Sequence, residues 1–354
     1  MKLFPEHIML NGTQIPVKKL LQNKNPKTGR EPELIDFLKE WYSGEKNLEV
    51  KTSGSTGTPK TIRLQKEFVA ESARRTLHFF KLKKNDRILH CLPMQYIAGK
   101  LMVVRALLSE LDLYLTEPST DFAFLKKEKF RFTAMVPNQV SKILKSETAP
   151  GELFGNIEKL LIGSSGIPAS LEKALQKVST VCYSSYGMTE TATHIALRKI
   201  NGAGADGWYH CLKNIRVCLS AESCLQIYLP GLENQPLQTN DLAKLRDEKT
   251  FRVLGRIDNV IISGGIKFSP EQLEKKLEPF ISEPFLISSL PHESLGQQLI
   301  LVVEAVENKK SGMKLQEICR RELEKYEQPR QIIFLPEIPQ TANGKIDRKA
   351  MFAK

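Results

Sequence analysis

The sequence predicts an α/β fold: a large N-terminal lobe with a mainly parallel sheet and helices plus a β-rich segment, followed by a small C-terminal α+β domain. Three observations support this. Between residues 86 and 187, short apolar segments alternate with helical segments through glycine-containing turns, which is typical of parallel sheets covered by helices. After residue 206 short apolar segments follow one another directly. The last part of the chain mixes strand patterns with two amphipathic helical ones.

The first half is expected to contain helices and strands in alternation. Residues 1–30 are expected to be weakly structured or to form a local hairpin. Residues 32–44 form an amphipathic pattern with Leu34 and Trp41 on one face and a glycine at the end, which predicts a helix. The elements predicted after it are a helix at 66–82, a strand at 86–93, a helix at 98–110, and strands at 111–116 and 132–137.

A strand, a Gly/Ser turn and a helix then follow at 157–163, 164–168 and 169–178, and a further strand at 181–187 enters another glycine turn. Parallel sheets bind ligands at the carboxyl ends of their strands. We therefore expect the turns after these two strands to converge on one cleft, together with the Gly/Ser/Thr-rich residues 52–60.

The rest of the chain predicts strands at 207–220, 224–230 and 242–256, and then a separate small unit. Its expected elements are a strand within 255–265, a helix at 270–280, strands at 285–290 and 298–306, a helix at 313–326 and a strand at 331–339. The predicted domains are therefore residues 1–256 and 257–354.

Composition narrows the function classes. The net charge is +12, but basic and acidic residues are interleaved, so we expect a mixed solvated surface that suits small polyanions rather than a nucleic-acid partner. No apolar run approaches the ~18 residues of a membrane helix, and the N-terminus lacks the apolar region of a signal peptide. The six cysteines have no metal-binding spacing, so free thiols in the cytoplasm are expected.

Residues 52–60, TSGSTGTPK, indicate a phosphate-binding loop. Gly54 and Gly57 let backbone N–H groups approach an anion, the hydroxyls add donors, and Lys60 adds a positive charge. The spacing is not that of a P-loop, because Pro59 stands where the second glycine belongs. The alternative is a polar surface loop.

Four segments in this order resemble the adenylate-forming superfamily of acyl-CoA synthetases, luciferases and adenylation domains. They are TSGSTGTPK (52–60), SSYGMTET (184–191), GRIDNVIISGGIKFSPEQLE (255–274) and IPQTANGKIDRKA (338–350). The likeness covers roughly residues 50–350, in a compact form whose region before the phosphate loop is shorter than in most relatives. It implies ATP and coenzyme A as co-substrates, Mg²⁺ as cofactor, a small carboxylic acid as substrate, and a mobile C-terminal domain.

The resemblance also implies roles for individual residues. Lys345, Thr189 and Glu190 would be catalytic, with Glu190 as the Mg²⁺ ligand; Asp258 would be the hinge; and Ser263, Gly264 and Gly265 would line the CoA path. The residues that would bind ATP or AMP are Thr52, Ser53, Gly54, Ser55, Thr56, Gly57, Thr58, Lys60, Gly163, Ser164, Ser165, Gly166, Ser185, Tyr186, Gly187, Met188, Thr189, Asp241 and Arg256.

The segment PMQYIAGKLMVVRALL (93–108) resembles that of the o-succinylbenzoate–CoA ligases of menaquinone biosynthesis. This implies that Gln95, Tyr96 and Arg105 contact the acid, with Arg105 binding its non-reacting carboxylate. Gln95 and Tyr96 stand where that family usually has a histidine. The alternative for Arg105 is a side chain that reaches solvent at the helix edge.

Three hypotheses remain open on the sequence alone. The first is a carboxylate–CoA ligase, and the second is an adenylating enzyme for another acid or for a carrier-protein thiol. The third is a nucleotide- or nucleic-acid-binding module without ligase activity. The sequence leaves the oligomeric state open.

Overall fold

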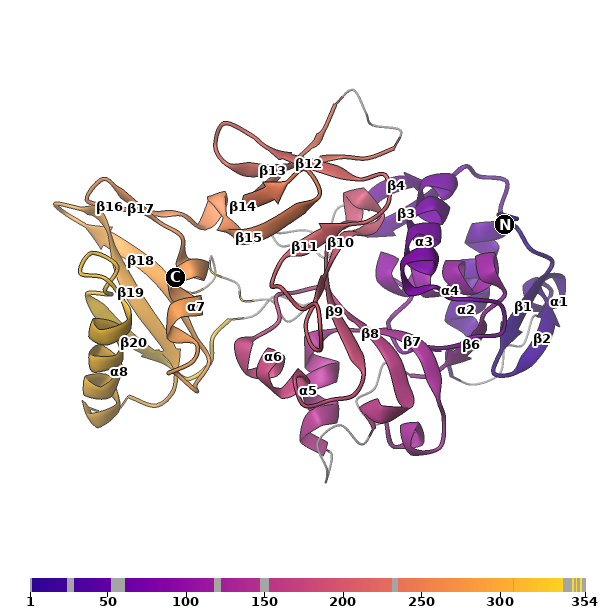
Figure 1. Cartoon of the computed structure of the whole chain (residues 1–354), viewed down its shortest axis with the longest axis horizontal. Helices are drawn as coiled ribbons and strands as arrows, with labels where there is room; N and C mark the ends of the chain where they lie inside the picture. The colour runs from indigo at the N-terminus through magenta and orange to yellow at the C-terminus, as the bar shows by residue number, and fades with distance from the viewer. Residues whose placement is uncertain are drawn as a thin grey trace. The chain divides into compact units, whose positions relative to one another are not determined.

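The computed structural model describes residues 2–23, 29–51, 61–117, 122–146, 153–230, 235–307, 309–339, 346, 348 and 351. The chain forms two compact units, Met1–Ile215 and Arg216–Lys354. Each unit has its own sheet strands and helices, which are labelled in Figure 1.

The first unit is built on a sheet whose strands lie in the order β11-β10-β9-β8-β7-β5-β6-β1-β2. The strands from β1 through β6, β5, β7 and β8 to β9 pair in parallel, so the predicted mainly parallel sheet is confirmed. Its strands are β1 (His7–Leu10), β2 (Thr13–Pro16), β5 (Arg87–His90), β6 (Asp112–Leu115), β7 (Phe130–Met135), β8 (Ile157–Ile162), β9 (Val181–Met188), β10 (Thr193–Lys199) and β11 (Tyr209–Cys211). A separate hairpin consists of β3 (Asn47–Lys51) and β4 (Thr61–Gln65).

Helices connect these strands, as the alternating pattern predicts. They are α1 (Val17–Leu21), α2 (Glu31–Tyr42), α3 (Lys66–Phe80), α4 (Ile97–Ser109), α5 (Pro137–Ser146) and α6 (Ala169–Leu175), with short 3₁₀ turns η1 (Ala123–Lys126), η2 (Phe154–Asn156) and η3 (Thr189–Thr191). Helix α4 is buried on nearly all sides, as expected of a helix that is apolar all round. Helices α3 and α4 pack against each other, side by side in Figure 1.

The N-terminal residues form a defined hairpin, so the alternative of a weakly structured segment is wrong for residues 2–23. Asn11 and Gly12 have φ values of 50° and 78°, the left-handed pair that a tight two-residue hairpin requires. The Gly12 amide donates to Asp112 Oδ1 over 2.7 Å, and β1 pairs with β6. The hairpin therefore extends the main sheet at its edge.

The second unit contains two sheets. The first is the antiparallel series β12 (Arg216–Leu219), β13 (Cys224–Tyr228), β14 (Leu237–Asp247) and β15 (Thr250–Arg256). The other has the order β17-β16-β19-β18, with β20 beside β19. The elements of this second part are η4 (Ile257–Asn259), β16 (Ile261–Ser263), β17 (Ile266–Phe268), α7 (Pro270–Leu277), β18 (Phe285–His292), β19 (Gly296–Glu304), α8 (Lys309–Glu322) and β20 (Gln331–Leu335).

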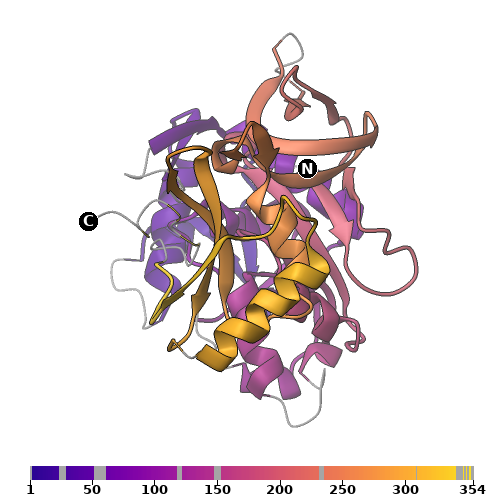
Figure 2. The same ribbon diagram turned by 90° about the vertical axis from the view of Figure 1, so that its left-hand side faces the viewer.

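The sheet that contains β19 has a core of its own. Leu273 and Leu277 of α7 and Leu315 and Ile318 of α8 pack in one cluster with Leu301 and other residues of that sheet, and Figure 2 shows α8 lying across it. The predicted boundary at 256/257 falls between the two sheets of this unit. The domain division at that point stays a prediction.

Candidate functional site

The loops after β8 and β9 lie together, as parallel neighbours require. Ile162 and Ser184 are paired in register, and the Ser185 hydroxyl donates to the Ile162 carbonyl over 3.2 Å. A Cβ on Gly163 would lie 2.4 Å from Ser185 Oγ. The predicted segments 163–166 and 185–190 therefore meet at one edge of the sheet.

The pairing of β9 with β10 depends on a glycine within β9. A Cβ on Gly187 would lie 2.1 Å from the Thr193 carbonyl oxygen and 2.5 Å from the Cα of His194, so β9 and β10 are too close there for any side chain. The ring of Tyr186 lies with its centroid 5.8 Å from that of Tyr209.

The 3₁₀ turn η3 holds Thr189 and Glu190. The Met188 amide donates to the Thr191 hydroxyl over 3.0 Å, and that hydroxyl lies 2.9 Å from the Met188 carbonyl oxygen. Glu190 is exposed. In the described part of the chain, no three His, Cys, Asp or Glu side chains gather as metal ligands. A single exposed carboxylate nevertheless fits Mg²⁺, which proteins bind through one or two carboxylates together with substrate phosphates.

In the second unit, three predicted residues are interconnected. Arg256 Nη1 lies 3.4 Å from Asp241 Oδ1, and Arg256 Nη2 donates to Asp258 Oδ2 over 2.7 Å. Asn240 donates to both carboxylate oxygens of Asp258 over 3.1 and 3.0 Å. Asn240 therefore has a partner at the predicted hinge that the sequence did not indicate.

The predicted CoA-path residues form a tight turn between β16 and β17. Gly264 and Gly265 have φ values of 57° and 83°, which a two-residue hairpin of this hand requires. The Gly264 amide donates to the Leu295 carbonyl over 3.0 Å.

Two predicted groups lie outside the described residues. They are Lys345 and the phosphate-loop residues 52–60, which include Thr52, Ser53, Gly54, Ser55, Thr56, Gly57, Thr58 and Lys60. Strands β3 and β4, which flank the loop, pair with each other up to Lys51 and Thr61.

The predicted acid-binding segment leads into α4. Gln95 is exposed and Tyr96 is half-buried at the helix start. A Cβ on Gly99 would lie 2.2 Å from the Pro93 carbonyl oxygen, so the segment folds back closely onto the helix.

Arg105 is buried inside α4, with 2% of the residue exposed. Its Nη1 lies 3.3 Å from Met102 Sδ, and its guanidinium lies 6.0 Å from the ring centroid of Phe132. Its Nε has no hydrogen-bond partner among the described residues. Burial lowers the pKa of Arg105 to about 9, which leaves it charged at neutral pH. The guanidinium does not reach solvent.

Two buried histidines near Arg105 were not anticipated from the sequence. His194 Nε2 lies 3.2 Å from Thr76 Oγ1, and its Nδ1 lies 3.4 Å from Thr193 Oγ1. Burial first, and then the positive charges of Arg105 and Arg75, hold the pKa of His194 well below its usual value. The pKa of His90 is also held well below its usual value, first by burial and then by the positive charges of Arg30 and Arg105. Both imidazoles are therefore neutral at pH 7.

This burial predicts a loss of stability in mild acid. The unfolded chain protonates a histidine below a pKa of about 6.5, whereas folded His194 stays neutral, so stability is lost as the pH falls through that value. Between pH 7 and pH 5.5 we expect His194 to account for about 1 kcal/mol of that loss. Urea unfolding of His194→Gln at both pH values should show a smaller loss than the wild type. His78→Gln, at an exposed position of α3, is the control, and an identical loss in wild type and His194→Gln would contradict this account.

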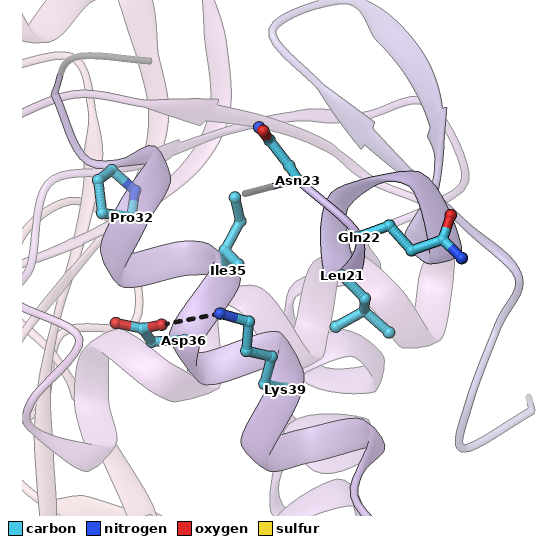
Figure 3. Close-up of a pocket in the computed structure, with 7 residues that line it drawn as sticks. All are labelled: Leu21, Gln22, Asn23, Pro32, Ile35, Asp36 and Lys39. Atoms are coloured by element: carbon cyan, nitrogen blue, oxygen red, sulfur yellow. Dashed lines mark ion pairs between the residues drawn. The ribbon is translucent and has the colours of Figure 1, made fainter. Parts of the chain in front are cut away.

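A cavity of about 550 Å³ lies away from these residues, between α1 and α2 (Figure 3). It is lined by Leu21, Gln22, Asn23, Pro32, Ile35, Asp36 and Lys39. None of the predicted site residues lines it. No helix in the described ranges is long and apolar enough to cross a membrane. All six cysteines are free thiols.

Two protein-family models match consecutive parts of this chain. The model for AMP-binding enzymes matches residues 52–217, and the model for the C-terminal domain of AMP-binding enzymes matches residues 286–345. The 2-succinylbenzoate–CoA ligase of Haemophilus influenzae is 27% identical over 317 residues, which cover 85% of this chain and 69% of the relative.

Solved structures give the same result. An acyl-CoA synthetase (AMP-forming)/AMP-acid ligase II-like protein from Dyadobacter fermentans is 34% identical with a TM-score of 0.63, over 94% of this chain and 96% of that one. The o-succinylbenzoate–CoA synthetase of Bacillus subtilis, in complex with ATP and a magnesium ion, shares the fold with a TM-score of 0.71 at 19% identity, over 96% and 82% of the two chains. By the family models and by this 34% identity over nearly the whole length of the Dyadobacter protein, the chain belongs to the AMP-binding, adenylate-forming enzymes.

Proposed function

We propose that this protein is an ATP-dependent acid–CoA ligase and that its acid is o-succinylbenzoate, a substrate of menaquinone biosynthesis. The observation that carries the choice of acid is Arg105, a charged side chain buried in the helix that follows the predicted acid-binding segment. The name of the Haemophilus relative supports the same choice. With ATP and coenzyme A as co-substrates, the reaction takes place in the cytoplasm.

The reaction has two steps. A carboxylate oxygen of the acid attacks the α-phosphorus of ATP, the bond to the β-phosphate oxygen breaks, and acyl-AMP and pyrophosphate form. The CoA thiolate then attacks the acyl carbon and AMP leaves. Both steps gather negative charge on oxygen, so positioned donors and cations contribute most of the catalysis.

Residues of the first unit bind the nucleotide and its phosphates. The loop 52–60 holds the β- and γ-phosphates, with Lys60 neutralising the pyrophosphate. Tyr186 presents its ring to the adenine, the segment 163–166 forms the opposite wall, and Thr189 donates to phosphate. Glu190 holds the Mg²⁺, which when bound offsets phosphate charge.

Residues of the second unit bind the ribose and supply the catalytic lysine. Asp241 accepts hydrogen bonds from the ribose hydroxyls, and Arg256 binds ribose or phosphate. For the first step, domain 257–354 brings Lys345 to the reacting carboxylate and the α-phosphate. Rotation about Asp258 then exchanges Lys345 for the Ser263–Gly265 turn, whose backbone lines the path of the CoA arm.

Arg105 selects the acid. A buried guanidinium offers two parallel N–H donors that match a carboxylate. An acid with a second carboxylate supplies the negative charge that Arg105 lacks among the described residues. A monocarboxylic acid leaves that positive charge buried and unpaired, which costs several kcal/mol.

ATP–pyrophosphate exchange tests the proposal. We expect o-succinylbenzoate to support exchange more strongly than any monocarboxylic acid in the same panel, and CoA to release the acyl group as its thioester. If ATP binds but none of the acids supports exchange, the proposed ligase activity is wrong. Release by a phosphopantetheinyl carrier protein but not by CoA would overturn the acceptor.

A further inference from the structure

A second buried arginine, Arg75 on α3, resembles Arg105 in its surroundings. Only 4% of the residue is exposed, and all three guanidinium nitrogens lack hydrogen-bond partners within the described ranges. The nearest carboxylate, Glu71, lies 3.9 Å from Arg75 Nη1, beyond hydrogen-bonding distance. Glu71 instead bonds the neighbouring Arg74 over 3.2 Å, and Glu67 bonds Arg74 over 2.6 Å.

Two other strongly buried cations of this unit, Arg30 and Lys100, have carboxylate partners. Arg30 is bonded to Glu33 over 3.0 Å and to three backbone carbonyls. Lys100 is bonded to Glu40 over 2.6 Å and to a backbone carbonyl. Burying a charge without such partners is strongly unfavourable. Arg75 therefore differs from these cations in having five donor hydrogens and no acceptor among the described residues.

Arg75 and Arg105 belong to one region of the molecule. Their helices α3 and α4 pack against each other, and α3 also contacts β10. Thr76, the residue after Arg75, bonds His194 of β10 over 3.2 Å, and both guanidinium groups are close enough to depress the pKa of that histidine. Two buried guanidinium groups therefore lie near the packing of α3, α4 and β10, and neither donates a hydrogen bond to a carboxylate among the described residues.

We propose that Arg75 and Arg105 together bind one carboxylate of the acid substrate, one guanidinium from each helix. Arg75 thus becomes a second specificity-determining residue, and the site takes dicarboxylic acids whose second carboxylate enters between α3 and α4. Arginine pairs of this kind bind a carboxylate through charge-assisted hydrogen bonds. The inference rests on the proposed function, since the acid is the one that the enzyme activates.

Binding can be measured without turnover. Calorimetric titration of o-succinylbenzoate is made into the full-length wild type, Arg75→Met and Arg74→Met. Arg74→Met is the matched control, because Arg74 is the adjacent arginine and is already paired with two carboxylates. We expect Arg75→Met to weaken binding by about 10- to 100-fold, the range for a lost hydrogen-bonded charge, and Arg74→Met to alter it far less. Arg75→Lys keeps the positive charge but loses the planar guanidinium, so its affinity for o-succinylbenzoate should lie between those of the wild type and Arg75→Met.

Thermal unfolding without ligand separates this role from a structural one. A buried guanidinium without hydrogen-bond acceptors destabilises the folded protein, so Arg75→Met should unfold at the same or a higher temperature than wild type. Equal binding by wild type and Arg75→Met, weaker binding by Arg74→Met than by Arg75→Met, or no binding of the dicarboxylate to wild type would each overturn the two-arginine site. ATP–pyrophosphate exchange tests the proposed function separately. If only monocarboxylic acids support exchange, the two-arginine site is wrong and the ligase activity stands. If the dicarboxylate binds as expected but no acid supports exchange, the two-arginine site stands and the ligase activity is wrong.

Discussion

Lys345→Ala is expected to lower the rate of acyl-adenylate formation by about 100- to 1,000-fold, the usual effect of removing one group that stabilises charge in the transition state. Negative charge grows on the oxygens around the α-phosphorus as the carboxylate attacks. A lysine positioned there stabilises the transition state more than bound ATP, so the loss appears in the rate and ATP affinity changes little. ATP–pyrophosphate exchange measures the rate, and equilibrium titration with ATP measures the affinity.

The second half-reaction provides the sharper comparison. If Lys345 leaves the site before thioester formation, the rate of thioester formation from ready-made acyl-adenylate and CoA should fall far less in the variant than the rate of ATP–pyrophosphate exchange. Lys314→Ala, at an exposed position of α8, controls for loss of positive charge in the same unit. Equal losses in both half-reactions would contradict a lysine that acts in the first step only, and wild-type exchange by Lys345→Ala would remove its catalytic role.

The chain beside Lys345 is anchored to the small sheet. Arg348 forms two hydrogen bonds with the Glu274 carboxylate of α7, over 2.6 and 2.8 Å, and a third with the Ile287 carbonyl of β18 over 2.6 Å. Glu274 also accepts the Ile287 amide over 2.8 Å. These bonds hold Arg348 to α7 and β18 of the proposed mobile domain.

The elements that the sequence predicted well are those whose signal is local. The amphipathic pattern at 32–44 gives α2, and the apolar stretches at 157–163 and 181–187 give β8 and β9, with ends that differ by a few residues. Helix α5 was not predicted. The place of β1 in the main sheet was also not predicted, because this four-residue strand pairs with β6, about a hundred residues away in sequence.

The site divides in the same way. Gly187 occupies a position where no side chain fits, and Gly264 has a left-handed backbone conformation that favours glycine, so these motif glycines indicate the local geometry from the sequence. Arg75, His194 and the Asn240–Asp258 contact are defined by packing between distant elements, which no spacing in the sequence encodes. The one available signal for Arg75 was its spacing of three residues from Ser72 on α3, which is also buried.

Arg105→Met is expected to lower kcat/KM for o-succinylbenzoate by about 30-fold or more, because truncating one partner of a buried charge pair costs about 2–5 kcal/mol. The comparison uses two monocarboxylic analogues that each lack one carboxylate, 4-oxo-4-phenylbutanoate and 2-butanoylbenzoate. The analogue that still supports exchange in the wild type keeps the reacting carboxylate. Its kcat/KM should fall much less in the variant, since it has no second carboxylate for Arg105 to bind.

The same variant should be more stable than the wild type when no acid is bound. Arg105 holds a charge inside the protein, with its Nε lacking a partner among the described residues, and replacing buried charges with apolar groups of similar volume often stabilises proteins by about 1–4 kcal/mol. Urea unfolding measures this change. A gain in stability together with a loss of dicarboxylate selectivity is the pattern of a residue kept for binding. Equal losses of kcat/KM for both acids, or a fall in stability, would instead make Arg105 a structural residue and remove the main support for o-succinylbenzoate.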